Sequence, residues 1–254
     1  MSRTWPAPAR PWSMTQMWHD LLFMHWPLPP DVLRPLLPPG LDLDTFDGRA
    51  WIGVVPFRMS GIRFRFLPPV PGTSAFPELN VRTYVTVGDK PGVWFFSLDA
   101  SNRLAVAAAR AWFRLPYFRA RMATRAEGEW ISYRSRRTHR GAPPGEVRAR
   151  YRPTGPAATA APGSLEHFLV ERYCLYAPAR RGGLARGEID HEPWPLQPAE
   201  CAVETNSVAP VTLPPDPPLL HFARRVRTRV WTLEPVPGRD AQGPPRGRGG
   251  APPL

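Results

Sequence analysis

The stretch that decides the fold occupies residues 78–84 and reads Glu-Leu-Asn-Val-Arg-Thr-Tyr. Side chains of a β-strand alternate between its two faces. One face therefore carries four bulky or polar groups: Glu78, Asn80, Arg82 and Tyr84. A strand in the middle of an apolar sandwich would not place so many polar groups on one buried face. The pattern predicts a strand that lines a polar cavity.

The sequence that follows predicts a β-hairpin and then a helix. A turn rich in Gly and Pro leads into a second strand at 93–99, which is apolar on both faces. Apolar residues then recur at helical spacing over 104–115. Ser101 or Asn102 can cap the start of this helix. Asp99, at the end of the strand, is expected to help cap the helix rather than to bind a ligand.

The remaining pattern predicts several further strands and two short helices. The expected strands are 14–26, 51–59, 130–134 and 146–152, and the expected short helices are 30–38 and the segment that Ser164 caps. The 36 prolines favour short strands joined by rigid turns. This arrangement indicates a β-dominant α+β chain, either a barrel or an α+β single domain.

Length and local composition predict one domain with disordered ends. The 254 residues suffice for one large domain, and 43% are hydrophobic. We expect residues 1–12 to be disordered, residues 13–235 to form the domain, and the Pro-, Gly- and Arg-rich tail 236–254 to be disordered.

The net charge of +12 comes almost entirely from arginine, because Lys90 is the only lysine. The arginines are scattered through strands and loops, which favours a solvated basic surface over nucleic-acid binding. The two cysteines cannot form a disulfide framework, and no metal-ligand spacing is present, so no metal or cofactor is expected. Apolar runs fall short of the roughly 20 residues of a membrane helix. We therefore expect a soluble cytoplasmic protein without membrane partners.

Arg82 and Glu78 are the strongest candidates for a ligand site. Arginine is a permanent planar cation that binds a carboxylate through two hydrogen bonds. The two residues are four positions apart, so their backbones lie about 13 Å apart along the strand. This distance is too long for a direct salt bridge. Each side chain must therefore find a cross-strand partner, a water or a ligand. A buried polar network that only fixes the barrel interior remains an equal alternative.

Several segments together resemble the DUF2071 (YqjF-like) family of uncharacterised bacterial proteins. They are 22–27 (LFMHWP), 76–85 (FPELNVRTYV), 92–100 (GVWFFSLDA), 115–117 (LPY), 165–169 (LEHFL), 171–173 (ERY) and 191–196 (HEPWPL). The resemblance covers about residues 14–235. It implies the acetoacetate decarboxylase-like superfamily, whose fold is a closed, mainly antiparallel β-barrel with a few short helices and a polar interior cavity.

The chain departs from acetoacetate decarboxylase where that enzyme does its chemistry. The decarboxylase forms a Schiff base through a lysine whose pKa is lowered by its surroundings. The corresponding stretch here, 111–117, contains Arg114 and no lysine, and a guanidinium stays protonated. The resemblance matches Glu78 to one active-site glutamate of the decarboxylase and indicates that another is replaced near Gly53. It thus implies a cavity without amine-based decarboxylation.

Three functions follow as hypotheses. The first is a binder of a small anionic metabolite; its ligand-binding residues are Glu78, Asn80, Arg82, Tyr84, Arg114 and Tyr117. The second is a lysine-independent enzyme on a keto acid or related compound, with Glu78 as general acid and base. The third is a structural protein whose barrel is filled. Exposed edges of an incompletely closed barrel would be compatible with a homo-oligomer.

Overall fold

The structure is a computed structural model that describes residues 3–68 and 75–237. The expected disordered ends fall partly outside these residues, at 1–2 and 238–254. The helices are short: α1 (Pro30–Leu33), the 3-10 turn η1 (Arg34–Leu36), α2 (Arg103–Trp112) and α3 (Leu165–Val170).

Strands form most of the chain. They are β1 (Met14–Leu28), β2 (Asp42–Leu43), β3 (Ala50–Phe64), β4 (Phe76–Val87), β5 (Lys90–Ala100), β6 (Tyr117–Glu127), β7 (Trp130–Arg137), β8 (Glu146–Pro153), β9 (Cys174–Pro178), β10 (Leu184–His191), β11 (Leu196–Asn206), β12 (Leu219–Val230) and β13 (Glu234–Pro235). The predicted hairpin, the long first strand and the antiparallel pair β7–β8 are confirmed.

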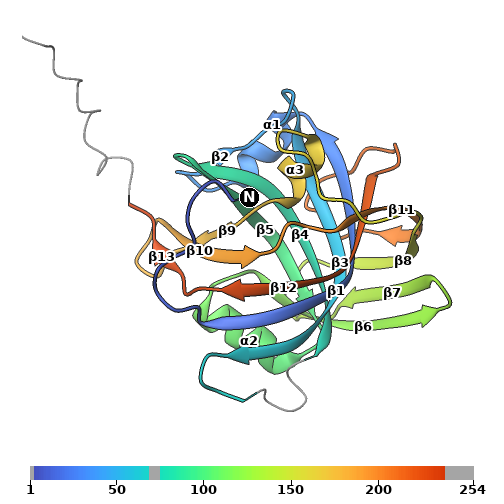
Figure 1. Ribbon diagram of the computed structural model, residues 1–254, viewed down its shortest axis with the longest axis horizontal. Coiled ribbons are helices and arrows are strands. Elements are labelled where there is room, and N and C mark those ends of the chain that lie inside the picture. Colours follow the sequence, from blue (N-terminus) through green and yellow to red (C-terminus); the bar gives the residue numbers. More distant parts are fainter. Residues whose placement is uncertain (1–2, 69–74, 238–254) are drawn as a thin grey trace, which may run out of the picture.

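The strand pairings close a barrel. One ring runs from β12 through β1, β3, β4, β5, β9 and β10 and returns to β12 (Figure 1). A second path leaves β5 through β6, β7, β8 and β11 and also returns to β12. Only the pairs β5–β6 and β5–β9 are parallel among the described strand pairs. The expected fold, a closed and mainly antiparallel barrel with a few short helices, is confirmed.

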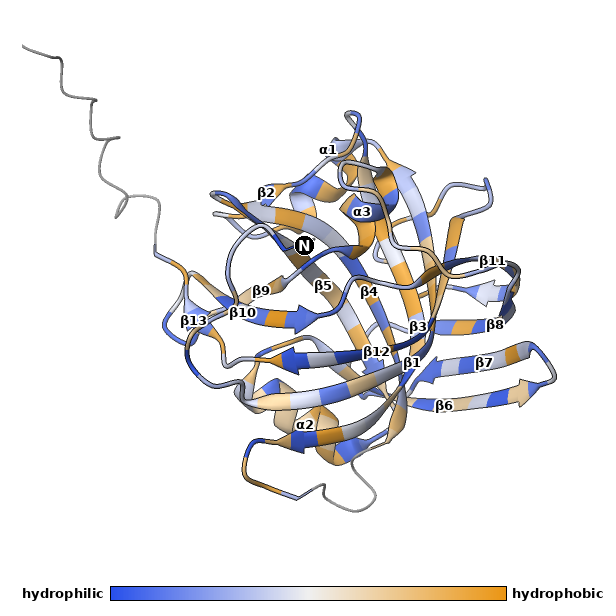
Figure 2. Ribbon diagram, viewed as in Figure 1, coloured by the Kyte–Doolittle hydropathy of each residue, from blue (hydrophilic) through white to orange (hydrophobic). Residues whose placement is uncertain are grey.

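The strand β4 is shared by both rings and is buried on both faces over residues 78–85, which explains its alternation. Glu78, Asn80 and Arg82 face the interior of the first ring. Leu79 and Val81 point the opposite way, into a second apolar cluster that includes aromatic side chains of β7 and β8. Figure 2 shows hydrophobic residues along much of β3, whereas hydrophilic residues dominate β7, which pairs with β6 on one side and β8 on the other.

The helix α2 begins where the sequence predicted. The Asn102 side chain accepts hydrogen bonds from the amides of Leu104 and Ala105, as an N-cap does. Ser164 caps α3 in the same way. The helix α2 lies at one end of the barrel, and α1 and α3 lie at the other (Figure 1). The two ends of the interior are therefore covered by different helices.

Asp99 differs from its expected role. Its side chain is 1% exposed and forms a 2.8 Å ion pair with Arg137 of β7, so it does not cap α2. Asp99 pairs with Leu79 in the β4–β5 ladder, and that register turns its side chain toward the second sheet rather than toward the helix.

The N-terminal segment, expected to be disordered, contacts the barrel over the residues that the structure describes. Arg3 forms an ion pair with Glu188 of β10, and Trp5 donates a 2.9 Å hydrogen bond to the same carboxylate. Lys90 lies with its ammonium 5.5 Å from the centre of the Trp5 ring. Composition favoured disorder here, but an aromatic ring and a cation in the first residues supply specific contacts.

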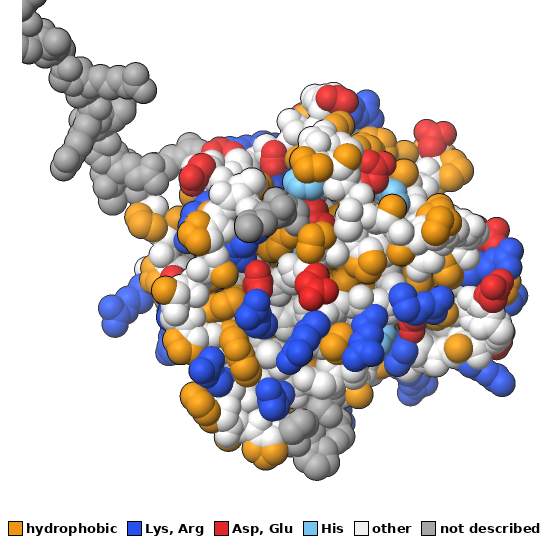
Figure 3. Space-filling view, in the orientation of Figure 1, with side chains coloured by type: hydrophobic (Ala, Val, Ile, Leu, Met, Phe, Trp, Pro, Cys, Tyr) orange, Lys and Arg blue, Asp and Glu red, His pale blue; other side chains and the backbone are white. Residues whose placement is uncertain are grey.

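The surface is basic without a single basic block. Arginine side chains are spread over several strands on the face shown in Figure 3, with acidic side chains among them. No described helix is both long enough and apolar enough to span a membrane.

Candidate functional site

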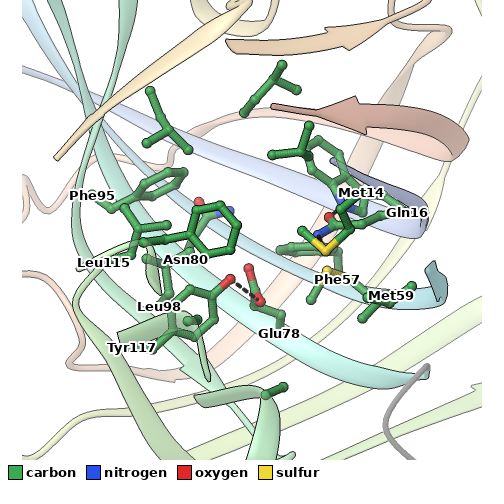
Figure 4. A pocket seen from close by; sticks show the side chains of 18 of the residues that line it. Met14, Gln16, Phe57, Met59, Glu78, Asn80, Phe95, Leu98, Leu115 and Tyr117 are labelled. Carbon is green, nitrogen blue, oxygen red and sulfur yellow. Dashed lines mark hydrogen bonds between the residues drawn. The ribbon is translucent and has the colours of Figure 1, made fainter. Parts of the chain in front are cut away.

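The first ring encloses a cavity of about 370 Å³. Its wall is mostly apolar, with contributions from β1, β3, β4, β5, α2 and the start of β6 (Figure 4). The side chains in the wall that carry a polar atom able to hydrogen-bond are Gln16, Trp18, Glu78, Asn80, Arg82, Trp112, Tyr117, Arg172, His191 and Trp194. The size falls within the range of about 300–1,000 Å³ that ligand pockets occupy.

Glu78 and Tyr117 meet in the wall of this cavity. The Tyr117 hydroxyl donates a 2.9 Å hydrogen bond to the Glu78 carboxyl (Figure 4). Strand pairing explains the meeting, because Glu78 is opposite Ala100 on β5, and Leu98 of β5 is opposite Tyr117 on β6. Both residues are ligand-binding candidates from the sequence, and the structure brings them together.

Burial changes the chemistry of Glu78. Only 3% of the residue is exposed. Burial raises the pKa of its carboxyl to about 8; the Tyr117 hydrogen bond opposes this rise, and the nearby Asp99 carboxyl adds to it. The carboxyl therefore holds its proton at neutral pH and can exchange it near pH 8, which suits a hydrogen-bond donor or a general acid and base.

Arg82 is a buried cation without an acidic partner. It is 8% exposed, and no described carboxylate forms an ion pair with it. Its Nη2 donates a 3.3 Å hydrogen bond to the main-chain oxygen of Leu169, whereas its Nε finds no acceptor among the described residues. The rings of Phe23 and Tyr84 lie 5.4 and 5.7 Å from the guanidinium carbon. The aromatic faces stabilise the cation in part.

Two other buried arginines show the contrast. Arg172 pairs with Asp44 at 2.5 Å, and Arg137 pairs with Asp99 at 2.8 Å. A buried charge is costly unless it is paired. Arg82 can therefore still bind an anion, whereas Arg137 and Arg172 already have a carboxylate partner.

Gly53 makes room for the His25 ring, next to Arg82. It lies opposite Arg82 in the β3–β4 ladder and opposite His25 in the β1–β3 ladder. A Cβ at this position would lie 3.0 Å from the His25 ring and 3.5 Å from Cγ of Arg82. The position that the resemblance linked to a missing glutamate is thus occupied by side chains from both neighbouring strands.

Asn80 completes the polar row on β4. It lines the cavity midway between Glu78 and Arg82, and its Oδ1 has no hydrogen-bond partner among the described residues. An unpaired buried amide oxygen can accept a hydrogen bond from a ligand. This position agrees with its expected place in the site.

Tyr84 lies outside the cavity wall and contacts His25. Its side chain is fully buried, and its hydroxyl lies 2.6 Å from Nε2 of His25. Burial, and then the charge of Arg82, hold the pKa of His25 well below its usual value, so the ring is neutral. Tyr84 is not among the residues that line the cavity, so its hydroxyl orients His25 rather than a ligand.

Arg114 and Lys90 lie away from the cavity. Arg114 is exposed just after α2, with a φ of 50°, and does not belong to the cavity wall. Lys90 opens β5 at the far end of the hairpin, where its half-buried side chain contacts Trp5. No described lysine lines the cavity.

Arg172, His191 and Gln16 line the cavity but were not among the predicted site residues. Arg172 lies over the Phe168 ring at 4.2 Å, and His191 stacks on Tyr173 with ring centres 4.5 Å apart. The first two belong to the segments ERY and HEPWPL that carried the family resemblance, so those motifs were the available signal. The described residues contain no group of three or more His, Cys, Asp or Glu side chains that could hold a metal ion.

Comparison with known proteins gives a family and a fold. The profile of DUF2071, described as an uncharacterized conserved protein, matches residues 15–227. The uncharacterized protein YqjF of Bacillus subtilis (strain 168) is 46% identical over 230 residues, which cover 89% of this chain and 94% of that protein.

Solved structures resemble the chain at much lower identity. Acetoacetate decarboxylase from Legionella pneumophila matches with a TM-score of 0.60 at 14% identity, over 93% of this chain and 94% of that one. An acetoacetate decarboxylase-like enzyme from Sphingomonas wittichii RW1 matches with a TM-score of 0.60 at 15% identity, over 90% and 94%. The enduracididine biosynthesis enzyme MppR, complexed with pyruvate, matches with a TM-score of 0.61 at 10% identity, over 89% and 91%. These matches establish a shared fold.

Proposed function

The chain belongs to the DUF2071 family, and we propose that it binds a small carboxylate-bearing metabolite inside its barrel, with Arg82 as the carboxylate clamp. The observation that carries the proposal is that this buried guanidinium lies in a cavity wall and has no carboxylate partner within residues 3–68 and 75–237. A carboxylate on Arg82 would supply the missing counter-charge through charge-assisted hydrogen bonds. Asn80 and Glu78 would orient the remainder of the ligand.

Native mass spectrometry of freshly purified protein tests the proposal together with the variants Arg82→Gln and Arg114→Gln. Arg114→Gln is the matched control, because Arg114 is an exposed arginine outside the cavity wall. We expect wild type to retain a small molecule in native mass spectrometry, or its melting temperature to rise when pyruvate is added. Arg82→Gln should abolish this effect, and Arg114→Gln should preserve it. The bound pyruvate of MppR, which has a related fold, makes pyruvate a reasonable first probe.

Two outcomes would reject the binding function. Binding that persists in Arg82→Gln would show that this guanidinium is not the clamp. If no acid raises the melting temperature while Arg82→Gln unfolds much more easily than wild type, the polar row would be a structural network in a filled barrel.

A lysine-independent enzyme is the second candidate, and the pKa of Glu78 favours it. A carboxyl whose pKa burial raises to about 8 can take a proton from the carbon next to a keto group and return it. Exchange of the methyl protons of pyruvate for deuterium, followed by NMR, tests this activity. We expect exchange that speeds up as pH rises through about 8 and disappears in Glu78→Gln. If the wild-type protein shows no exchange, the enzyme is rejected and the binding function is the candidate that stands.

Schiff-base chemistry can be tested separately. Borohydride is added to the protein with acetoacetate, and the intact mass is measured. We expect no trapped adduct at Lys90, because this lysine is at the far end of the β4–β5 hairpin from the α2 end of the cavity. An adduct would overturn the assignment of a lysine-independent site.

A further inference from the structure

The cavity is charged at one end and apolar at the other, and from this polarity we propose that its ligand is a monocarboxylate with an extended apolar body. The carboxylate binds Arg82, and an alkyl or aryl-alkyl group extends past Asn80 and Glu78 toward α2. The inference rests on the proposed function and adds the class of ligand that the site selects.

Strand register fixes the direction of the polarity. Along β4 the cavity passes Arg82, Asn80, Glu78 and Phe76 in turn. Six residues at about 3.3 Å each place the first and last about 20 Å apart. The Arg82 end lies near α3, whose Leu169 oxygen accepts the guanidinium hydrogen bond. The Phe76 end lies toward α2, so a ligand held by Arg82 must extend toward this helix.

The wall beyond Glu78 is almost entirely apolar. On β3, Phe57 is opposite Glu78 and Met59 is opposite Phe76. The further apolar side chains at this end are Met14, Ile62, Leu98, Ala105, Ala108, Ala109 and Leu115. Polar groups of a ligand would find few partners here, and burial of apolar atoms is the main favourable term that this end can supply.

Gln16 and Glu78 lie near this end, and neither disfavours the binding of an apolar group. Gln16 already accepts a 2.8 Å hydrogen bond from the Trp18 indole. Glu78 is bonded to Tyr117, and because burial raises its pKa to about 8, its carboxyl is uncharged at neutral pH. An alkyl chain can therefore pass both residues without desolvating a charge.

Small residues on α2 provide the space. Ala105, Ala108 and Ala109 face the cavity, whereas Ala107 is exposed on the other side of the helix. A ligand as small as pyruvate would leave this end of the cavity unfilled. Each methylene added to a ligand that reaches it should increase affinity about fourfold until the space is filled.

The test is a series of straight-chain acids, propanoate, octanoate, dodecanoate and tetradecanoate, with 8-phenyloctanoate as the aryl member. Binding is measured by calorimetry and by the change in tryptophan fluorescence, since Trp18, Trp112 and Trp194 line the cavity. In wild type we expect affinity to rise by about fourfold per methylene until the space is filled. Ala108→Phe should remove the gain for dodecanoate and tetradecanoate and keep propanoate binding. Ala107→Phe, the matched control, should behave as wild type.

The outcomes separate the two proposals. If acids bind through Arg82 but affinity does not grow with chain length, the apolar body is rejected and the carboxylate clamp stands. If Ala108→Phe weakens propanoate and tetradecanoate equally, the direction toward α2 is rejected. If Ala108→Phe does not fold, Ala109→Leu applies the same test with a smaller side chain. If no acid binds, or octanamide binds as tightly as octanoate, the proposed function itself fails.

Discussion

The Tyr117 hydroxyl lies 2.9 Å from Oε2 of Glu78 and joins β6 to β4 across the cavity wall. This contact depends on the parallel pairing of β5 and β6, which begins at Tyr117 directly after Pro116. The hydroxyl donates a hydrogen bond to the buried carboxyl but brings no positive charge to it. The pKa of Glu78 is therefore raised by burial and by the Asp99 charge and lowered by this hydroxyl.

Tyr117→Phe should raise the pKa of Glu78 further. The hydroxyl stabilises the ionised carboxyl, so its loss leaves burial and the Asp99 charge unopposed. The measurement is a carbon-13 NMR titration of the glutamate carboxyls, with Glu78→Gln used to assign the signal. Tyr133→Phe is the control, since that hydroxyl donates to the main-chain oxygen of Glu78 and not to its carboxyl. An unchanged or lower pKa in Tyr117→Phe would contradict the prediction.

Glu78 should make the protein less stable as pH rises. Its folded pKa of about 8 lies above the ordinary value of 4.5, so between these values the folded chain keeps the proton and the unfolded chain releases it. The stabilising contribution is fully present below about pH 4.5 and is lost progressively up to about pH 8. Relative to Glu78→Gln, the free energy of unfolding of wild type should fall by up to about 1.4 kcal/mol per pH unit in this window.

Urea unfolding at pH 5, 6, 7 and 8 measures this difference. Comparison with Glu78→Gln cancels the contributions of buried histidines such as His25 and His191, whose pKa values burial lowers. Glu129→Gln changes an exposed carboxylate, so its free energy of unfolding should change with pH in the same way as that of wild type. A wild-type minus Glu78→Gln difference that stays flat from pH 5 to pH 8 would show that Glu78 titrates near its ordinary value.

Asp99→Asn should destabilise the barrel by about 3–5 kcal/mol, because it leaves the Arg137 guanidinium buried without a counter-charge. Arg137 is held between Asp99 and the Phe118 ring, 4.5 Å from its guanidinium carbon, and cannot easily reach solvent. Glu129→Gln breaks the more exposed pair with Arg152 and should cost less than about 1 kcal/mol. Equal effects of the two variants on urea unfolding would rule out a structural role for the buried pair.

The same pair shows where sequence reasoning reaches its limit. Local patterns predicted the alternation of β4, the β4–β5 hairpin and the Asn102 cap, because strand periodicity and capping involve residues close in the chain. Asp99 was assigned to the helix that follows it because no local feature points to Arg137, which is 38 positions away. Such a partner becomes visible only once β6 and β7 lie beside β5.

The candidate site divides in the same way. Glu78, Asn80 and Arg82 were found from the alternation of one strand, and they do share the cavity. Tyr84 continues that alternation, but its hydroxyl is taken up by His25 from another strand. Arg114 was included because the family resemblance matches residues 111–117 to the lysine segment of the decarboxylase, but its side chain is exposed, with a left-handed backbone at φ 50°. Spacing along a strand predicts a face, while cross-strand partners decide which members of that face are available.

Gly53→Ala should cost about 1–3 kcal/mol of stability. The backbone at Gly53 is not in the left-handed region, so alanine is not strained there. The cost comes from the new methyl group, which would lie 3.0 and 3.1 Å from two atoms of the His25 ring. Since that ring is held by Tyr84 and stacks at 6.0 Å on Phe23, it has little freedom to move aside.

A double-mutant cycle isolates this contact. In a His25→Ala background the ring is absent, and Gly53→Ala should become neutral or slightly stabilising, because alanine reduces the entropy of the unfolded chain. Urea unfolding of the four proteins gives the coupling energy between positions 25 and 53. A cost of Gly53→Ala that is the same with and without the His25 ring would contradict the prediction. Arg82 Cγ could not account for such a cost, because at 3.5 Å from the new methyl group it would be at an ordinary van der Waals distance.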